Sequence, residues 1–326
     1  MNERFVVAGV GPGTPLAKAA PAILAAKASP LFRLEESARI GADIDAVHDM
    51  RVASRRVREA MRLFKPVYAP VEWKRWYSRV RRITRALGPV RDSDVFIDTF
   101  AKMAPDMGDG GGRRAVAFLV GLRTGRRSLE LERLNRELAH LDLKRTRREF
   151  AALTEAVELG PTGRRPLVVF AYAEVADRAS LVFGLQPRAL DEASAAEQHV
   201  LRILYKRLRY AVEALAPCYG EAFDGVHDVL TGFQDALGDL HDFHLFAEIA
   251  AGPGTLAEAA RAGVAESDFS DVHGWLAERA HEAHSRFIAI DHANPPGTLL
   301  PALLLPLEET EKVGDAGVGE APQVDA

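Results

Sequence analysis

Two stretches of the sequence decide the fold: HDMRVASRRVREAMRLFKPVY at residues 48–68 and HVLRILYKRLRYAVEALAPCY at residues 199–219. When the second is laid on the first at an offset of 151 residues, the histidine, most of the basic residues, the proline and the tyrosine coincide. A further match relates LGPVRDSDVF at residues 87–96 to LGDLHDFHLF at residues 237–246. The same elements recur in the same order, which indicates a duplicated unit packed with pseudo-two-fold symmetry.

The rest of the chain has the periodicity of amphipathic helices, because apolar residues recur at intervals of three and four. The expected helices cover residues 31–40, 46–65, 71–87, 92–103, 114–158, 168–182, 194–216, 222–250 and 256–290. Gly and Pro separate them, for example at Gly88-Pro89 and at Gly252-Pro253. Asp43 or Asp45 is expected to cap the helix that carries His48, and Ser194 the helix that carries His199. We therefore predict an all-α fold with mostly short connections.

The composition limits the class of protein. The chain has 326 residues with 42 Lys and Arg, 46 Asp and Glu, and a net charge of −4. Its single Cys218 excludes a disulfide framework and a multi-cysteine zinc site, and fits a reducing compartment. A run of about 18 uninterrupted apolar residues, which a membrane span needs, is missing. The start also lacks the pattern of a secretory signal. We predict a cytoplasmic protein without membrane contact.

The chain is expected to divide into four segments. Residues 1–20 are predicted to be a flexible leader, because Gly and Pro dominate their second half and no strand–loop–helix context supports a phosphate-binding glycine loop. Residues 21–160 form the first helical repeat and residues 161–307 the second. Residues 308–326 are acidic and rich in Gly, which predicts a disordered tail.

Each repeated helix carries a stripe of positive charge opposite its apolar face. In the first copy the stripe consists of His48, Arg51, Arg55, Arg58 and Arg62. In the second copy it consists of His199, Arg202, Lys206 and Arg209. A solvated helix face usually mixes charges of both signs, and like charges at this spacing are destabilising. A bound polyanion would offset that cost, so we favour a polyanion site over a solvated face.

The surrounding charge is uneven. Residues 48–91 contain 13 Lys and Arg against three acidic residues, whereas residues 199–245 contain four basic and seven acidic residues. In the helix after the first stripe, Arg75, Arg79 and Arg82 share a face. Arg dominates over Lys, and its planar guanidinium binds phosphate in a bidentate manner. The positive field is expected to be strongest over the first repeat.

At these motifs the chain resembles the CHAD domain family, the conserved histidine α-helical domain. The resemblance spans roughly residues 25–305 and implies two four-helix-bundle-like repeats with a basic central groove that binds inorganic polyphosphate. It implies association with polyphosphate granules and polyphosphate-metabolising enzymes, with no catalytic residue, cofactor or metal. Arg56 and Arg207 match the motif but lie off the stripe, and are expected either to bind the ligand or to pair with Asp92 or Asp242. The full set of expected polyphosphate-binding residues is His48, Arg51, Arg55, Arg56, Arg58, Arg62, Arg75, Arg79, Arg82, His199, Arg202, Lys206, Arg207 and Arg209.

Three alternatives remain open. A metal site would use the i, i+3 histidine pairs His241/His244 or His281/His284. A metal-dependent polyphosphate hydrolase would need clustered carboxylates, for which Asp92 and Asp94 are the candidates. Nucleic-acid binding would use the same electrostatics with exposed aromatic side chains for stacking, and the aromatic residues near the basic segment are Trp73, Trp76 and Tyr77.

Overall fold

Helices make up the computed structural model, which describes residues 5–155, 157 and 161–316. The helices are α1 (Leu16–Arg33), α2 (Glu35–Ile40), α3 (Ile44–Leu63), α4 (Pro70–Met103), α5 (Gly111–Leu141), α6 (Leu143–Glu155), α7 (Pro161–Arg164), α8 (Leu167–Ala189), α9 (Ala195–Ala214), α10 (Ala222–Ala251), α11 (Pro253–Arg261), α12 (Ser270–Ala293) and α13 (Pro296–Ala316). These ranges contain isolated β-bridges but no β-strand, so the all-α prediction is confirmed. None of the helices so described combines the length and apolar content needed to span a bilayer.

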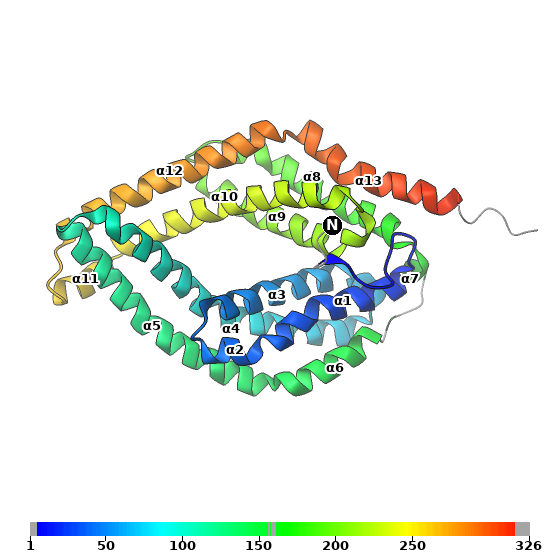
Figure 1. Cartoon of the computed structure of the whole chain (residues 1–326), viewed down its shortest axis with the longest axis horizontal. Coiled ribbons are helices and arrows are strands. Elements are labelled where there is room, and N and C mark those ends of the chain that lie inside the picture. Colours follow the sequence, from blue (N-terminus) through cyan, green and yellow to red (C-terminus); the bar gives the residue numbers. More distant parts are fainter. Residues whose placement is uncertain (1–4, 156, 158–160, 317–326) are drawn as a thin grey trace, which may run out of the picture.

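The two halves of the chain lie one above the other and share their packing (Figure 1). Helices α1 to α6 form the lower part of the view, and α8 to α10, α12 and α13 the upper part. One continuous apolar core nevertheless includes Phe64 and Leu87 from the first half together with Phe233 and Phe287 from the second. A second, smaller core joins α4 and α5 to α10, α11 and α12 at the far end of the molecule.

The helices with the repeated motif begin and end as local sequence dictates. Asp43 precedes α3, and its Oδ1 accepts a hydrogen bond from the backbone N–H of Asp45 at 2.8 Å, as predicted for a helix cap. Ser194 holds the same position before α9, but its side chain makes no capping bond. Each helix is followed by one short 3₁₀ turn, at Lys65–Val67 and at Ala216–Cys218. The repeat in the sequence therefore reappears as a repeat in local structure.

The predicted break at Gly88-Pro89 is wrong, because both residues lie inside α4, a single helix of 34 residues. Proline inside a helix removes a backbone hydrogen bond and costs about 3 kcal/mol. Packing offsets this cost on both sides: Leu87 and Val90 are buried in the main core, and Phe96 and Phe100 in the second core. Pro187 likewise lies within α8 without ending it.

The ends of the chain differ from the sequence-based expectation in part. Residues 5–20 were expected to belong to a flexible leader, but Phe5 is buried against Phe223 with 5.0 Å between ring centroids. Helix α1 already begins at Leu16, which is fully buried. The apolar side chains of this segment thus find partners that lie far away in the sequence. At the other end, α13 extends into the predicted acidic tail as far as Ala316, and residues 317–326 lie outside the described residues.

Candidate functional site

The two basic stripes meet where α3 and α9 pack against each other. The Arg51 guanidinium of α3 lies against α4, where Nη1 donates to the carbonyl oxygen of Thr84 at 3.3 Å and Nη2 lies 3.4 Å from Oδ1 of Asp92. Burial lowers the pKa of Arg51, Asp92 opposes this, and the neighbouring Arg55 lowers it further. Arg51 is therefore a mostly buried cation with one long, partly exposed carboxylate contact.

Gly88 is required by this placement of Arg51. A Cβ atom at residue 88 would lie 2.8 Å from Nη1 of Arg51, closer than such atoms approach one another. At the repeat-related Gly238 of α10, a Cβ atom would meet nothing within 4 Å. The same glycine in the two motifs therefore has a steric role in the first copy that it lacks in the second.

The second repeat places an equivalent pair beside the first. Arg202 of α9 and Asp242 of α10 occupy the positions of Arg51 and Asp92 in the repeated motif. Burial lowers the pKa of Arg202, Asp242 and Asp92 raise it, and Arg55 of the other repeat lowers it. Burial also raises the pKa of Asp242 to about 6, against the effect of Arg202. These mutual effects show that side chains of both repeats share one electrostatic environment, which we call the central cluster: Arg51, Arg55, Asp92, Arg202, Lys206 and Asp242.

Lys206 is the most perturbed cation of the central cluster. Burial lowers its pKa to about 7, and Arg55, Arg202 and Arg51 lower it as well, whereas Glu59 acts in the opposite direction. Within the part of the chain that the structure describes, neither Arg55 nor Lys206 forms a hydrogen bond or an ion pair. Four basic and two acidic side chains make up the cluster, so it holds an excess of positive charge.

The repeated histidines flank the central cluster, and the pKa of each is lowered. Burial lowers the pKa of His48, and Arg91 of α4 adds to this effect. Burial, Arg202 and Lys206 lower the pKa of His199, whose Nδ1 lies 3.4 Å from Nδ1 of His241. Burial, followed by Arg202, lowers the pKa of His241 to about 4. In the described residues, no three His, Cys, Asp or Glu side chains are arranged to hold a metal ion.

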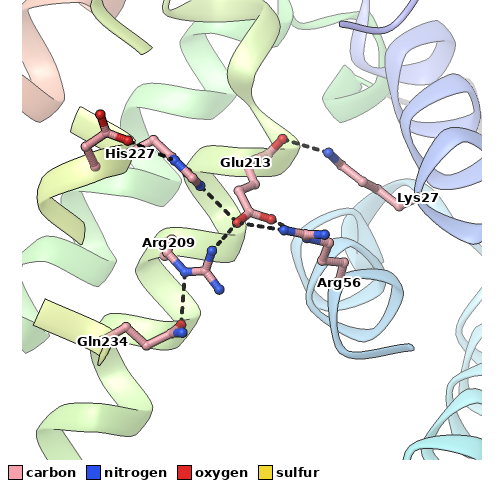
Figure 2. Close-up of polar contacts among 7 residues, drawn as sticks. Lys27, Arg56, Arg209, Glu213, His227 and Gln234 are labelled. Atoms are coloured by element: carbon pink, nitrogen blue, oxygen red, sulfur yellow. Dashed lines mark hydrogen bonds and ion pairs between the residues drawn. The ribbon is translucent and has the colours of Figure 1, made fainter. Parts of the chain in front are cut away.

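Two of the predicted binding residues instead hold a buried carboxylate (Figure 2). Glu213 of α9 is wholly buried, and its side chain accepts from Arg56 Nε at 2.6 Å and from Arg209 Nη1 at 2.5 Å. His227 Nε2 lies 3.2 Å from the same carboxylate, and Lys27 Nζ donates to the Glu213 carbonyl oxygen at 2.9 Å. Burial alone would raise the pKa of Glu213, but His227, Arg209 and Arg56 lower it to about 2. We call Glu213, Arg56, Arg209 and His227 the Glu213 cluster.

The Glu213 cluster corrects one expectation about Arg56. The Arg56 guanidinium pairs with Glu213 and not with Asp92 or Asp242. Glu213 is the single acidic residue in the second motif, lying among apolar neighbours at its end. A lone carboxylate on an otherwise basic and apolar helix was the available sign that some of the arginines would be used within the fold.

The remaining stripe residues lie further along α3 and α9. The guanidiniums of Arg58 and Arg62 lie 5.9 Å and 5.5 Å from the ring centroid of Tyr77, and Nε of Arg58 is buried without a hydrogen-bond partner. Arg62 also pairs with Glu59. The exposed Arg207 lines a hollow of about 300 Å³ that includes Glu59, Arg62, Asp177 and Arg178. These side chains form an outer margin and do not belong to the central cluster.

The three predicted residues of α4 are not brought to the central cluster. Arg79 pairs with Glu149 of α6 at 2.7 Å, and Arg82 pairs with Glu137 of α5 at 2.7 Å. Arg75 is exposed. The face of α4 that they share turns towards α5 and α6, whose positions could not be known from the α4 sequence alone.

Another face of α4 carries basic residues that the sequence analysis did not select. Positions 74, 81, 85 and 92 fall within an arc of roughly 40° on a helix. Lys74, Arg81 and Arg85 are exposed and form no ion pair within the described residues, and they share this face with Asp92 of the central cluster. At an offset of 150 residues the same face of α10 presents Asp224, Thr231, Asp235 and Asp242. The two faces are thus opposite in charge.

Residues 22–251 match the model of the CHAD domain family, from within α1 to the end of α10. The chain belongs to the CHAD domain family. The matched segment contains both copies of the repeated motif, so the family expected from the resemblance is confirmed. Helices α11, α12 and α13 lie beyond the matched segment of this CHAD protein.

Two solved structures have a similar fold. The crystal structure of the CHAD domain from the plant Ricinus communis gives a TM-score of 0.59 at 23% identity, and the match covers 94% of this chain and 96% of that one. PptA from Streptomyces chartreusis gives a TM-score of 0.66 at 18% identity, covering 85% of this chain and 99% of PptA. At these identities the likeness concerns the fold.

A curated relative is similar over part of its length. The uncharacterized protein MT2285 of Mycobacterium tuberculosis (strain CDC 1551 / Oshkosh) is 28% identical over 210 residues. This match covers 61% of the present chain and 38% of MT2285, so the chain spans well under half of the relative that it matches.

Proposed function

We propose that this CHAD protein binds inorganic polyphosphate at the central cluster and does not turn it over. The observation that carries the proposal is the convergence of Arg51, Arg55, Arg202 and Lys206 from two helices, where the acidic neighbours Asp92, Asp242 and Glu59 are fewer than the cations. Neighbouring cations that lower one another's pKa raise the free energy of the unbound protein, and a polyanion between them would remove that cost. Polyphosphate offers a charge at every unit, which suits cations fixed on rigid helices.

The surrounding charges suggest the direction in which a bound chain continues. Lys74, Arg81 and Arg85 extend the positive surface from the central cluster along α4, whereas the repeat-related face of α10 is acidic. We therefore place the continuation of the polyphosphate chain on the first repeat. The basic groove between the repeats that the resemblance implies stays a prediction, as do the cytoplasmic location and the association with polyphosphate granules and their enzymes.

The geometry gives little support to a metal-dependent hydrolase. The two candidate carboxylates of α4 are held apart, because Asp92 lies beside Arg51 while the buried Asp94 pairs with Arg127 of α5. Two-metal phosphoryl transfer needs carboxylates that face one another. A binding function is the simpler account of a site in which arginine is the dominant side chain.

Nucleic-acid binding is also less well supported than polyphosphate binding. Trp73 and Trp76 are each only 3% exposed, and both contribute to the apolar core. Trp73 stacks on Tyr68 with 4.4 Å between ring centroids, and Trp76 packs edge-on against Phe150. The indole rings are therefore engaged within the protein, whereas binding of single strands uses exposed rings on which bases stack.

The decisive test is a titration of the full chain with long-chain polyphosphate at several salt concentrations. The wild type should bind with an affinity that falls linearly, on logarithmic axes, with salt. The double variant Arg55→Glu/Lys206→Glu should lose roughly 100-fold in affinity and show a shallower salt dependence, because two positive charges of the central cluster are reversed. Circular dichroism and thermal unfolding would establish that the variant keeps its fold.

A matched control reverses the same number of charges outside the central cluster. Arg75 and Arg148 are both exposed, on α4 and α6. The variant Arg75→Glu/Arg148→Glu should lose less than about threefold, since only the net charge changes. Equal losses in the two double variants would contradict the proposal, and so would tighter binding of single- or double-stranded DNA than of polyphosphate at the same salt concentration.

A further inference from the structure

A hollow of about 740 Å³ lies on the outside of the first repeat, where α1 and α2 face the junction of α5 and α6. Helices α2 and α6 lie at the edge of that repeat which faces away from α9 and α10 (Figure 1). The residues that line the hollow belong neither to the central cluster nor to the Glu213 cluster. Sites for small molecules usually have volumes of about 300–1,000 Å³, so the hollow has the size of a ligand site that the proposed function does not use.

The walls of the hollow are fixed by contacts within the protein. At the end of α2, Gly41 has a φ of 67°, and its carbonyl oxygen accepts a hydrogen bond from Arg127 Nη2 of α5 at 3.0 Å. A Cβ atom at residue 41 would lie 2.5 Å from Cδ2 of Leu131, so α2 and α5 approach each other closely here. On the other side, Oδ1 of Asp142 accepts a hydrogen bond from the backbone N–H of Arg145, in the first turn of α6, at 3.1 Å. The hollow is therefore formed by packed helices before any ligand binds.

Three cations line the hollow without a partner in the part of the chain that the structure describes. They are Arg33 of α1 and Lys144 and Arg147 of α6, whose exposed side chains enter no hydrogen bond or ion pair there. A further cation, Arg39, lies 3.6 Å from Glu35 on α2. Burial raises the pKa of Glu35, whereas Arg39 and then Lys144 lower it, so α6 lies within electrostatic reach of α2 across the hollow. Unpaired arginine and lysine side chains from two helices suit an anion with several charges, such as a short chain of phosphates.

The remaining lining groups indicate that the ligand is more than a string of phosphates. Glu36 is exposed and, within the described ranges, unpaired, so it would repel a bare anion but accept a hydrogen bond from a hydroxyl or amino group. Asn135 of α5 donates through Nδ2 to a backbone carbonyl of α2 at 3.0 Å, while its Oδ1 is buried without a donor. Phe32, Leu143 and Ile40, which is 66% exposed, add apolar surface. The hollow thus combines cations, oxygen acceptors and apolar area.

We propose that this hollow binds a nucleoside di- or triphosphate, at a site separate from the central cluster. A nucleotide carries all three features that the walls complement: phosphates for Arg33, Lys144 and Arg147, hydroxyl and amino donors for the oxygen acceptors, and a planar base for the apolar area. Polyphosphate lacks the donors and the base, so the two ligands are expected at different places. The inference goes beyond the proposed function and does not depend on it.

Isothermal titration calorimetry of the full chain with ATP, with GTP and with inorganic triphosphate tests the ligand class. At least one nucleotide should bind about tenfold more tightly than inorganic triphosphate at the same salt concentration, because the base adds apolar contact to the same number of phosphates. Ile40→Ser should lower the affinity for that nucleotide about fourfold and change the affinity for triphosphate less than about twofold. Ile44→Ser is the control, because Ile44 is 44% exposed and lies outside the hollow, and it should leave both affinities unchanged.

Charge reversal locates the site. Arg147→Glu should lower the nucleotide affinity about tenfold, because a cation that meets the phosphates is reversed. Arg148→Glu changes the neighbouring exposed residue of α6, which does not line the hollow, and should lower the affinity less than about threefold. Arg55→Glu/Lys206→Glu should also keep the nucleotide affinity within about threefold of the wild type, since it changes the central cluster. Circular dichroism would establish that each variant keeps its fold.

The outcomes separate this inference from the proposed function. Failure of both nucleotides to bind, or equal affinities for the nucleotides and inorganic triphosphate, would overturn the inference whatever polyphosphate does. Equal losses in Arg147→Glu and Arg148→Glu would overturn it too. A nucleotide affinity lost in Arg55→Glu/Lys206→Glu but kept in Arg147→Glu would place the nucleotide at the central cluster, against the inference. If polyphosphate fails to bind the wild type, the proposed function falls and the nucleotide site stands.

Discussion

The central cluster and the Glu213 cluster both lie where α3 packs against α9 and use similar side chains, yet they differ in the groups that balance their positive charge. Arg55 and Arg56 are adjacent in the sequence, and each approaches α9. Arg56 meets Glu213, a buried acceptor that also takes Arg209 and His227. Arg55 meets Arg202 and Lys206, which have the same sign of charge. The fold therefore supplies a buried carboxylate acceptor for Arg56 but, among the described residues, no hydrogen-bond or ion-pair partner for Arg55.

The largest effect is expected from removing the acceptor of the Glu213 cluster. Glu213→Gln leaves the partly buried Arg56 and the buried Arg209 without a carboxylate and should lower the free energy of unfolding by about 3–5 kcal/mol. Denaturant unfolding at pH 7 measures this loss. Asp98→Asn, which breaks the exposed pair with Lys102, is the control and should cost less than about 1 kcal/mol.

The pH dependence of this loss has a defined sign. Because the pKa of Glu213 is lowered to about 2 in the folded protein, from 4.5 as the reference, its stabilising effect is present above about pH 4.5 and lost as the pH falls towards 2. The difference between wild type and Glu213→Gln should therefore be constant above pH 5 and shrink below it. A difference that grew on acidification would contradict the assignment of the ionised form.

A smaller effect of opposite sign is expected at the central cluster. Burial raises the pKa of Asp242 from 3.8 to about 6, so the ionised carboxylate opposes folding. The free energy of unfolding is therefore higher below about pH 4, and it falls as the pH rises through about 6. Asp242→Asn should stabilise the free protein at pH 8 by about 1–3 kcal/mol and tighten polyphosphate binding several-fold. The gain in stability should disappear below about pH 4.

The control for this variant lies on the same helix. Asp239→Asn removes an exposed pair with Arg286 at 2.8 Å and should lower stability by less than about 1 kcal/mol. If Asp242→Asn also destabilised the protein at pH 8, Asp242 would resemble Glu213, and the distinction between the two clusters would fail. Thermal unfolding and calorimetric titration at pH 4 and pH 8 provide both comparisons.

The smallest effect concerns the faces of α4 and α10 that lead away from the central cluster. Arg81→Thr/Arg85→Asp gives α4 the residues that α10 has at the related positions, Thr231 and Asp235. We expect about a tenfold loss of polyphosphate affinity, because the first repeat then loses its extended positive surface. The reciprocal Thr231→Arg/Asp235→Arg should increase affinity by about threefold. If both variants changed the salt dependence of binding equally, the bound polyphosphate would not continue along α4 in preference to α10.

Much of the fold was accessible from local patterns. The motif helices, the cap by Asp43 and the break at Gly252-Pro253 follow from side-chain periodicity and from backbone chemistry that act within a few residues. The continuation of α4 through Gly88-Pro89 was not accessible, since contacts of Leu87 and Phe96 with distant segments override the local break. The packing of the N-terminal segment was not predictable for the same reason, because Phe5 packs against Phe223, which is far away in the sequence.

The candidate site was predictable to the level of the helix face but not of the individual side chain. The stripe residues Arg51, Arg55, Arg202 and Lys206 lie near one another, because their spacing fixes which face of each helix they share. The ion pairs of Arg79 and Arg82 depend on carboxylates of α6 and α5, and the ion pair of Arg209 depends on the buried Glu213. Such partners are set by tertiary packing, which a single helix does not encode.

Gly88 and Gly238 finally illustrate how two copies of one motif become free to diverge. An alanine at residue 88 would displace the Arg51 guanidinium, whereas an alanine at residue 238 would meet open space and favour the helix by about 1 kcal/mol. Sequence drift is therefore restrained at one glycine and unrestrained at the other. A motif search that demands the glycine in both halves would pass over proteins that keep the whole arrangement around Arg51 intact.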